Sequence, residues 1–186
     1  MRYFISLAYN GTHFHGWQCQ PNAVSVQEVL EDALTTVLRT SIKVTGAGRT
    51  DTGVHAKLMI AHFDASIPDD IYGNLVYILN QFLKTDLVIH SISPVKEDAH
   101  ARFDAQIRTY EYHIDLEKNP FSKGLAYLFR DALDLDKMNE AAQLMQTFKD
   151  FEAFSKTHTD AKTFFCDISN AEWTKKEGGY VFKITA

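Results

Sequence analysis

The sequence predicts an α+β protein made of two ferredoxin-like halves, each a split βαβ unit, of which the second is incomplete. Two observations predict this class. Short segments alternate apolar and polar residues, which is typical of strands, and the segments between them space their apolar residues as helices do. Their order is strand, helix, strand, strand, helix, strand, and the order then starts again. We therefore expect a mixed, largely antiparallel sheet with helices packed on one face.

The first half opens with a strand and a capped helix. Alternation over residues 3–9 predicts the strand, and Asn10-Gly11 then favours a turn. Ser25 and Glu28 have the spacing of a capping box, in which the serine hydroxyl accepts from an amide three residues on and the glutamate reaches back. Residues 26–38 follow with one apolar stripe at helical spacing, so a helix is expected there.

Three strands and a second helix complete the first half. Asp69 or Asp70 can cap this helix. The strands are expected near residues 42–45, 58–63 and 87–93, and the apolar stripe of the helix would be Ile71, Leu75, Ile78 and Phe82.

The second half repeats only part of this order. Residues 110–116 alternate as a strand, a helix is expected from about Asp136 to Phe148, and strands near 164–173 and 180–185 are joined by a hairpin. We therefore expect two domains, 1–100 and 101–186, and a chain truncated inside the second, without its last helix and strand. The inward-facing helical residues would be Leu135, Met138, Ala142, Met145 and Phe148.

Composition is that of a soluble globular protein, and its charge argues mildly against nucleic-acid binding. The net charge is −5, whereas a nucleic-acid binder is expected to carry a basic surface. The first 60 residues are different, because they hold five Lys or Arg against four Asp or Glu. The acidic surplus therefore lies downstream, where it can occupy a face remote from RNA.

Several kinds of site are not expected. Cys19 and Cys166 are far apart and lack metal-binding spacing, and His13 and His15 have no evident third ligand, so we expect neither a disulfide nor a metal. No apolar run is long enough to cross a membrane, and the first residues lack the apolar core of a signal peptide. A cytoplasmic protein is expected.

The most unusual segment is the glycine-rich stretch from Gly46 to Ala56, which lies between two predicted strands. Its glycines permit close backbone approach and positive φ, so the loop can hold Arg49 and Asp51 in a fixed, irregular geometry. A phosphate-binding P-loop does not fit, because no Gly-Lys-Ser/Thr follows and no helix begins there. An ordinary tight connection between strands remains the alternative.

The stretch Gly48-Arg49-Thr50-Asp51-Thr52-Gly53-Val54-His55-Ala56 resembles the signature loop of the TruA family of tRNA pseudouridine synthases. Other matching pieces follow the order of that family along nearly the whole chain. They are Tyr9-Asn10-Gly11 with Phe14, Gly16-Trp17-Gln18, Ser25-Val26-Gln27-Glu28, His100-Ala101-Arg102-Phe103, Arg108-Thr109-Tyr110-Glu111-Tyr112, Ala141-Ala142, and Asp150-Phe151 with Phe154.

The resemblance implies a role for each matching residue. Asp51 matches the catalytic aspartate, Arg49 an arginine that contacts RNA, and Tyr110 a tyrosine that packs against the target base. His100, Arg102 and Phe103 match a loop near the active cleft. The family's basic partner of the aspartate falls in the part of the family that lies beyond Ala186.

The resemblance also implies the reaction. Uridine at positions 38, 39 and 40 of the tRNA anticodon stem-loop would be isomerised to pseudouridine, without a cofactor, by a homodimer. An ionised Asp51 could act as a nucleophile or as a base. Tyr110 could offer a stacking face to the extruded base. It is also expected on the same face of the strand as Tyr112 and Ile114, which fits a core residue instead.

Two other functions fit the same residues. The first is a non-catalytic RNA-binding module, which would bind tRNA without isomerising it. The second is a small-molecule enzyme on the same scaffold, with Asp51 as a general base, which tRNA would not inhibit.

Overall fold

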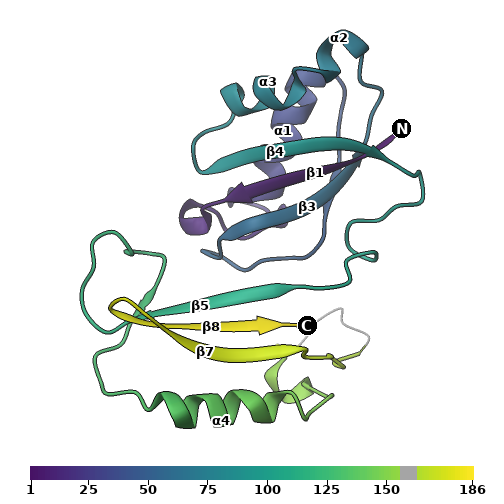
Figure 1. Cartoon of the computed structure of the whole chain (residues 1–186). Coiled ribbons are helices and arrows are strands. Elements are labelled where there is room, and N and C mark those ends of the chain that lie inside the picture. The colour runs from purple at the N-terminus through teal and green to yellow at the C-terminus, as the bar shows by residue number, and fades with distance from the viewer. Residues whose placement is uncertain (156–162) are drawn as a thin grey trace. The chain divides into compact units, whose positions relative to one another are not determined.

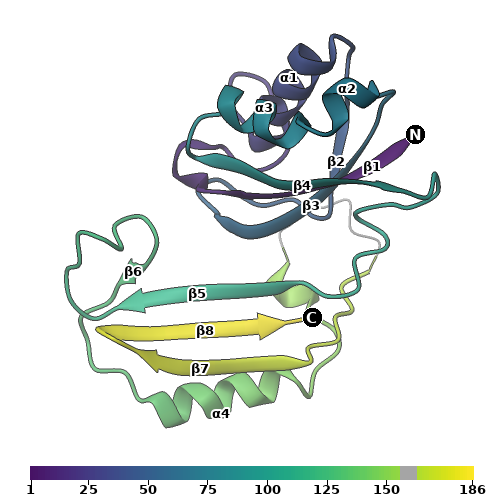
Figure 2. The same ribbon diagram turned by 45° about the horizontal axis from the view of Figure 1, so that its top comes forward.

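The computed structural model describes residues 1–155 and 163–186, and the chain folds as two compact units, Met1–Gln106 and Ile107–Ala186. Each unit has its own four-stranded sheet (Figures 1 and 2). The predicted α+β class is therefore confirmed. Within the described residues, the structure has no helix of the length and apolarity that a membrane crossing requires.

The sheet of the first unit has the strand order β2-β3-β1-β4, and every neighbouring pair is antiparallel. β1 (Arg2–Tyr9) is central and buries every second side chain, as its alternation predicts. β3 (Ala56–Asp64) and β4 (Leu87–Val95) flank it, and β2 (Val44–Gly46) is the edge strand beside β3.

Helix α1 (Val26–Leu38) begins at the predicted capping box. The amide of Glu28 donates to the Ser25 hydroxyl at 3.2 Å, and the amide of Ser25 donates to the Glu28 carboxylate at 3.4 Å. The apolar stripe of α1 is buried at Val26, Leu30 and Leu34. Together with α3 (Leu75–Phe82), α1 covers one face of the sheet (Figure 2).

The second helix of this unit differs from the prediction. It is broken into α2 (Asp69–Tyr72) and α3, because Asn74 leaves helical geometry at φ −115° and ψ 2°. Pro68 precedes the first turn without a side-chain cap, so neither aspartate caps the helix. Because of the break, the side chains of α3 do not continue the apolar stripe that one unbroken helix would have. Leu75 and Leu79 are buried, whereas Phe82 is 55% exposed.

The second unit has the strand order β6-β5-β8-β7. The long strands are β5 (Thr109–Asp115), β7 (Asn170–Lys176) and β8 (Gly179–Thr185), and α4 (Leu135–Met145) runs along β7 (Figure 1). The hairpin between β7 and β8 turns at Gly178, whose φ of +72° favours glycine. A two-residue strand, β6 (Tyr127–Leu128), pairs parallel with β5 and was not predicted.

Two predictions in this unit are wrong in detail. Helix α4 ends at Met145, since the amide of Gln146 turns back to the carbonyls of Gln143 and Leu144, and Phe148 beyond it is 58% exposed. Strand β7 begins at Asn170 rather than near residue 164, and Asn170 pairs with Thr185, the last residue of β8.

Candidate functional site

The glycine-rich segment forms the loop between β2 and β3, with Asp51 and Arg49 both exposed on it. The loop leaves the sheet at Ala47, whose amide donates to the carbonyl of Ile60 at 2.8 Å. It re-enters at Ala56, opposite Tyr9 of β1. The two residues that carry the resemblance to a catalytic site therefore share one loop, which starts and ends in the central sheet.

Thr50 fixes the loop on the side that precedes Asp51. Its hydroxyl is 2.9 Å from the hydroxyl of Tyr9, and its carbonyl accepts from the amide of Trp17 at 3.1 Å. Tyr9 and Trp17 are both buried. Because a buried side chain and a buried backbone segment both hold Thr50, the residue next to Asp51 has little freedom to move.

The side that follows Asp51 is fixed as well. The amide of Val54 donates to the carbonyl of Asp51 at 3.2 Å, which closes a turn in which Gly53 has φ +78°. The amide of Gly53 donates to the carbonyl of Phe14 at 3.2 Å, and Nδ1 of His55 accepts from the amide of Gly11 at 3.0 Å. Asp51 therefore lies in a tight turn that is anchored on both sides.

Two glycines allow the segment Gly11–Trp17 to approach this turn. A Cβ on Gly11 would lie 2.0 Å from the carbonyl oxygen of Val54. A Cβ on Gly16, whose φ is +84°, would lie 2.4 Å from the carbonyl oxygen of Thr50. No side chain fits at either position, so these glycines are required by the close packing of two backbones.

The turn that carries Arg102 and Phe103 is docked on β3 through His62. Nδ1 of His62 accepts from the amide of Ala101 at 3.1 Å, and both residues are buried. Burial, helped by Arg2 and His100, lowers the pKa of His62 below its ordinary 6.5. A neutral imidazole is the form that can accept this hydrogen bond, so the pKa shift and the contact agree.

His100 shapes the turn itself. Its Nδ1 accepts from the amides of Arg102 and Phe103 at 3.2 and 3.3 Å, and its own amide donates to Asp104 at 2.7 Å. The ring of Phe103 stacks on that of His100, with centroids 4.2 Å apart, and Phe103 remains 77% exposed. The turn therefore presents an aromatic and a cationic side chain to solvent.

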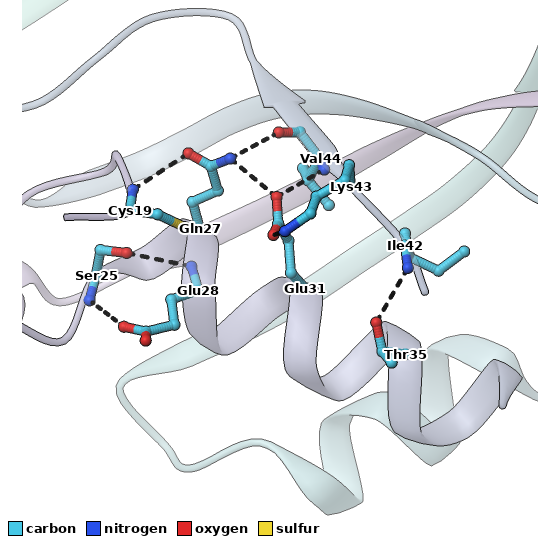
Figure 3. A network of polar contacts seen from close by, with 9 residues as sticks. All are labelled: Cys19, Ser25, Gln27, Glu28, Glu31, Thr35, Ile42, Lys43 and Val44. Carbon is cyan, nitrogen blue, oxygen red and sulfur yellow. Dashed lines mark hydrogen bonds and ion pairs between the residues drawn. The ribbon is translucent and has the colours of Figure 1, made fainter. Parts of the chain in front are cut away.

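A polar network around the buried Glu31 joins α1 to the start of β2 (Figure 3). The carboxylate of Glu31 accepts from Lys43 at 2.8 Å, from the amide of Val44 at 3.0 Å and from the side chain of Gln27 at 2.9 Å. Burial alone would raise the pKa of Glu31, but these three hydrogen bonds outweigh it and hold the pKa below the ordinary 4.5. Glu31 therefore stays ionised and fixes β2, which leads directly into the loop.

Gln27 extends this network to the segment that anchors Thr50. Its amide nitrogen also donates to the carbonyl of Val44 at 3.0 Å, and its amide oxygen accepts from the amide of Cys19 at 3.4 Å. Its own backbone amide donates to the carbonyl of Trp17 at 2.9 Å. One side chain thus ties together α1, β2 and the chain after Trp17.

Tyr110 belongs to the second unit, on β5, whereas Asp51 and Arg49 belong to the first. It is 53% exposed, and Tyr112, on the same side of the strand, is 52% exposed, while Ile114 is buried. Tyr110 is therefore not a core residue.

Sequence reasoning missed His62 and Glu31. Both interrupt otherwise apolar patterns: His62 stands between Ala61 and Phe63 in β3, and Glu31 stands beside Leu30 in α1. A polar residue at a position that its pattern makes buried was the signal that could have identified them. Of potential metal ligands, the described part of the chain brings no three His, Cys, Asp or Glu together.

Comparison of the sequence with known proteins supports the family resemblance of the Asp51 loop. The family model described as tRNA pseudouridine synthase matches residues 5–104, which include the Asp51 loop and the turn of Arg102. The chain is 51% identical to a tRNA pseudouridine synthase A of Bacteroides thetaiotaomicron, covering 100% of this chain and 70% of that protein. It is 52% identical to that of Bacteroides fragilis and 50% identical to that of Porphyromonas gingivalis, covering 74% and 75% of those proteins. This chain therefore belongs to the tRNA pseudouridine synthase family.

Proposed function

We propose that this protein isomerises uridine to pseudouridine in tRNA, with Asp51 as its catalytic carboxylate. The observation that carries the proposal is the doubly anchored turn, which exposes an aspartate in a loop of this family. The reaction breaks the N-glycosidic bond, rotates the uracil and forms a carbon–carbon bond through C5. Atoms and electrons balance within the nucleotide, so the reaction consumes no co-reactant.

The carboxylate has two chemical uses in this reaction. It can attack the sugar or the uracil ring as a nucleophile, or it can remove a sugar proton as a base. Both uses require an ionised group held in a fixed position beside the reacting atoms. The anchors on Thr50 and Gly53 supply the fixed position.

In this proposal, Arg49 and Tyr110 bind the RNA substrate. Arg49 is exposed two residues before Asp51, so its guanidinium can contact RNA near the reacting nucleotide. The half-exposed ring of Tyr110 can pack against the extruded base, which recovers roughly 1–3 kcal/mol of the stacking lost on extrusion.

The target positions, the location and the assembly in this proposal rest on the resemblance of the Asp51 loop to the TruA family. The target uridines are those at positions 38, 39 and 40 of the anticodon stem-loop, and the enzyme works in the cytoplasm as a homodimer. Large apolar side chains are exposed on the second unit, and exposed apolar surface can serve as a docking face for a second copy of the chain. They include Phe121, Phe154 and Phe165, which are 91%, 84% and 74% exposed.

The test is to incubate the purified protein with unmodified tRNA transcripts and to map pseudouridine at single-nucleotide resolution. Transcripts with cytidine at positions 38, 39 and 40 are the matched control. Product confined to these positions is expected. Binding of tRNA without product, or product that persists in the control transcripts, would contradict the proposal. Light scattering of the same preparation should give twice the monomer mass.

A further inference from the structure

A pocket of about 150 Å³ lies beside the Asp51 loop, within the first unit. Its lining residues include Trp17, Gln27, Thr45, Gly48, Arg49 and Arg102, and Asp51 is not among them. Since a water molecule occupies roughly 30 Å³ of liquid, the pocket has room for a group of phosphate size. The pocket is therefore separate from the catalytic carboxylate but adjacent to its loop.

The charge of the lining favours an anion. Two arginines line the pocket, and no aspartate or glutamate is among its described lining residues, although the whole chain carries a net charge of −5. The nearby carboxylate of Glu31 is already neutralised by Lys43 and by the amide of Val44. Guanidinium groups bind phosphate through paired, charge-assisted hydrogen bonds, so two of them suit this ligand.

The two arginines come from separate segments, each held in place. Arg49 precedes Thr50, which Tyr9 and Trp17 anchor. Arg102 lies in the turn docked on His62, and His62 pairs across the sheet with Thr45, which lines the pocket. The backbone segments that carry Arg49 and Arg102 are therefore both anchored to the sheet, and both residues line the same pocket.

The rest of the lining is neutral, and two of its side chains are held in place. A Cβ on Gly46 would lie 2.5 Å from the ring of Trp17, so this indole packs directly on the β2 backbone. The Gln27 side chain is held by Val44 and Glu31 (Figure 3). A neutral lining with two cations is the arrangement expected of an anion subsite.

We propose that this pocket binds one backbone phosphate of the tRNA, adjacent to the target nucleotide, and that Arg102 is its principal ligand together with Arg49. The inference rests on the proposed function, because the pocket borders the loop of Asp51. Arg102 would then position the RNA without taking part in bond making.

The first arm of the test measures tRNA binding to wild type and to Arg102→Gln over a range of salt concentrations. Each lost phosphate contact should lower the slope of log Kd against log salt by about 0.7 to 0.9 and weaken binding roughly tenfold. Arg102→Lys should retain the slope because it retains the charge. Arg39→Gln, at the far end of α1 and about 18 Å from Gln27, removes the same charge elsewhere and should retain wild-type binding.

The second arm identifies the phosphate. Single neutral methylphosphonates are placed along an anticodon stem-loop, and each is combined with wild type and with Arg102→Gln. At one position near the target uridine, the two changes should be non-additive, so that Arg102→Gln has no further effect. Additivity at every position, or equal losses for Arg102→Gln and Arg39→Gln, would overturn the subsite. Failure of wild type to form pseudouridine would overturn only the proposed function, because binding still decides the subsite.

Discussion

Glu31 is a buried residue that supports the candidate site indirectly, by fixing the strand that leads into the Asp51 loop. Its carboxylate is almost inaccessible to solvent, yet it is ionised because three donors surround it. It joins the middle of α1 to the residues that start β2, and β2 leads directly into the Asp51 loop. A substitution of Glu31 should therefore lower the stability of the fold and also disturb the geometry of the Asp51 loop.

We predict that Glu31→Gln lowers the free energy of unfolding by about 1–3 kcal/mol, because it removes a charged acceptor while its donors remain. The lowered pKa of Glu31 means that the folded state binds fewer protons than the unfolded state. The stability that Glu31 contributes is therefore present at neutral pH and is lost as pH falls below 4.5 through the folded pKa.

Urea unfolding of wild type and Glu31→Gln between pH 3 and pH 7 measures this effect. The difference between the two proteins should shrink toward acidic pH. Lys43→Gln is the control, because it removes the exposed partner and leaves the bonds from Val44 and Gln27, so its loss should be smaller. A difference that stays constant over this pH range would contradict the role given to Glu31.

His62 gives a second pH-dependent prediction. Its pKa is lowered in the folded state, so protonation below the ordinary value of 6.5 opposes folding. Stability should be complete above pH 6.5 and should decline as pH falls through the lower, folded pKa. In His62→Gln, whose side-chain oxygen can still accept, this decline should be absent. Equal declines in both proteins between pH 7.5 and pH 5 would show that His62 is not responsible.

At the scale of elements, the loop between β2 and β3 depends on contacts with the segment Gly11–Trp17. Gly16 and Gly53 both have positive φ, but only Gly16 is also pressed against backbone. They form a matched pair, because alanine meets the same conformational strain at both positions and a steric clash at one.

We predict that Gly53→Ala costs about 1–2 kcal/mol of stability, the usual cost of that backbone conformation. Gly16→Ala should cost more and should also slow pseudouridine formation, because its Cβ displaces the carbonyl of Thr50 and with it the anchored turn. Urea unfolding and single-turnover kinetics measure the two effects. Equal costs for both variants would mean that the close approach at Gly16 does not hold the loop.

Elements with strong local signals were predictable from the sequence. Helix α1 has a capping box and a continuous apolar stripe, and the structure reproduces both. The helix after Pro68 was harder, because Ile71, Leu75 and Phe82 fit one stripe only if no break occurs at Asn74. Strand β6 has two residues and exists only through its pairing with β5, so no local pattern could reveal it.

At the scale of the whole molecule, the two units differ in how much apolar surface they bury. The main core cluster lies in residues 3–92, whereas the described residues of the second unit bury few apolar side chains. Native-state hydrogen exchange should therefore give higher protection in β1 and β3 than in β5 and β8, although each of these strands lies between two others in its sheet. Equal protection would contradict this division.

The candidate site was predictable only in part, because some of its contacts join residues that are far apart in the sequence. The loop was recognisable from consecutive residues, Gly48 to Ala56, so Asp51 and Arg49 could be proposed from the sequence. Its anchors are distant in the chain, since Tyr9 and Thr50 are separated by 41 positions, and no local pattern encodes such a contact. Tyr110 was identified by resemblance, and its exposure came only from the structure.

The central claim is that a fixed turn presents Asp51 as the catalytic carboxylate. The most direct measurement is single-turnover pseudouridine formation by Asp51→Asn, with tRNA affinity measured in parallel. The side-chain amide of this variant has nearly the same shape as the carboxylate of Asp51, but it can act neither as an anionic nucleophile nor as a base. We predict a rate at least about 100-fold lower with tRNA affinity little changed. A variant that forms pseudouridine at the wild-type rate would contradict the account.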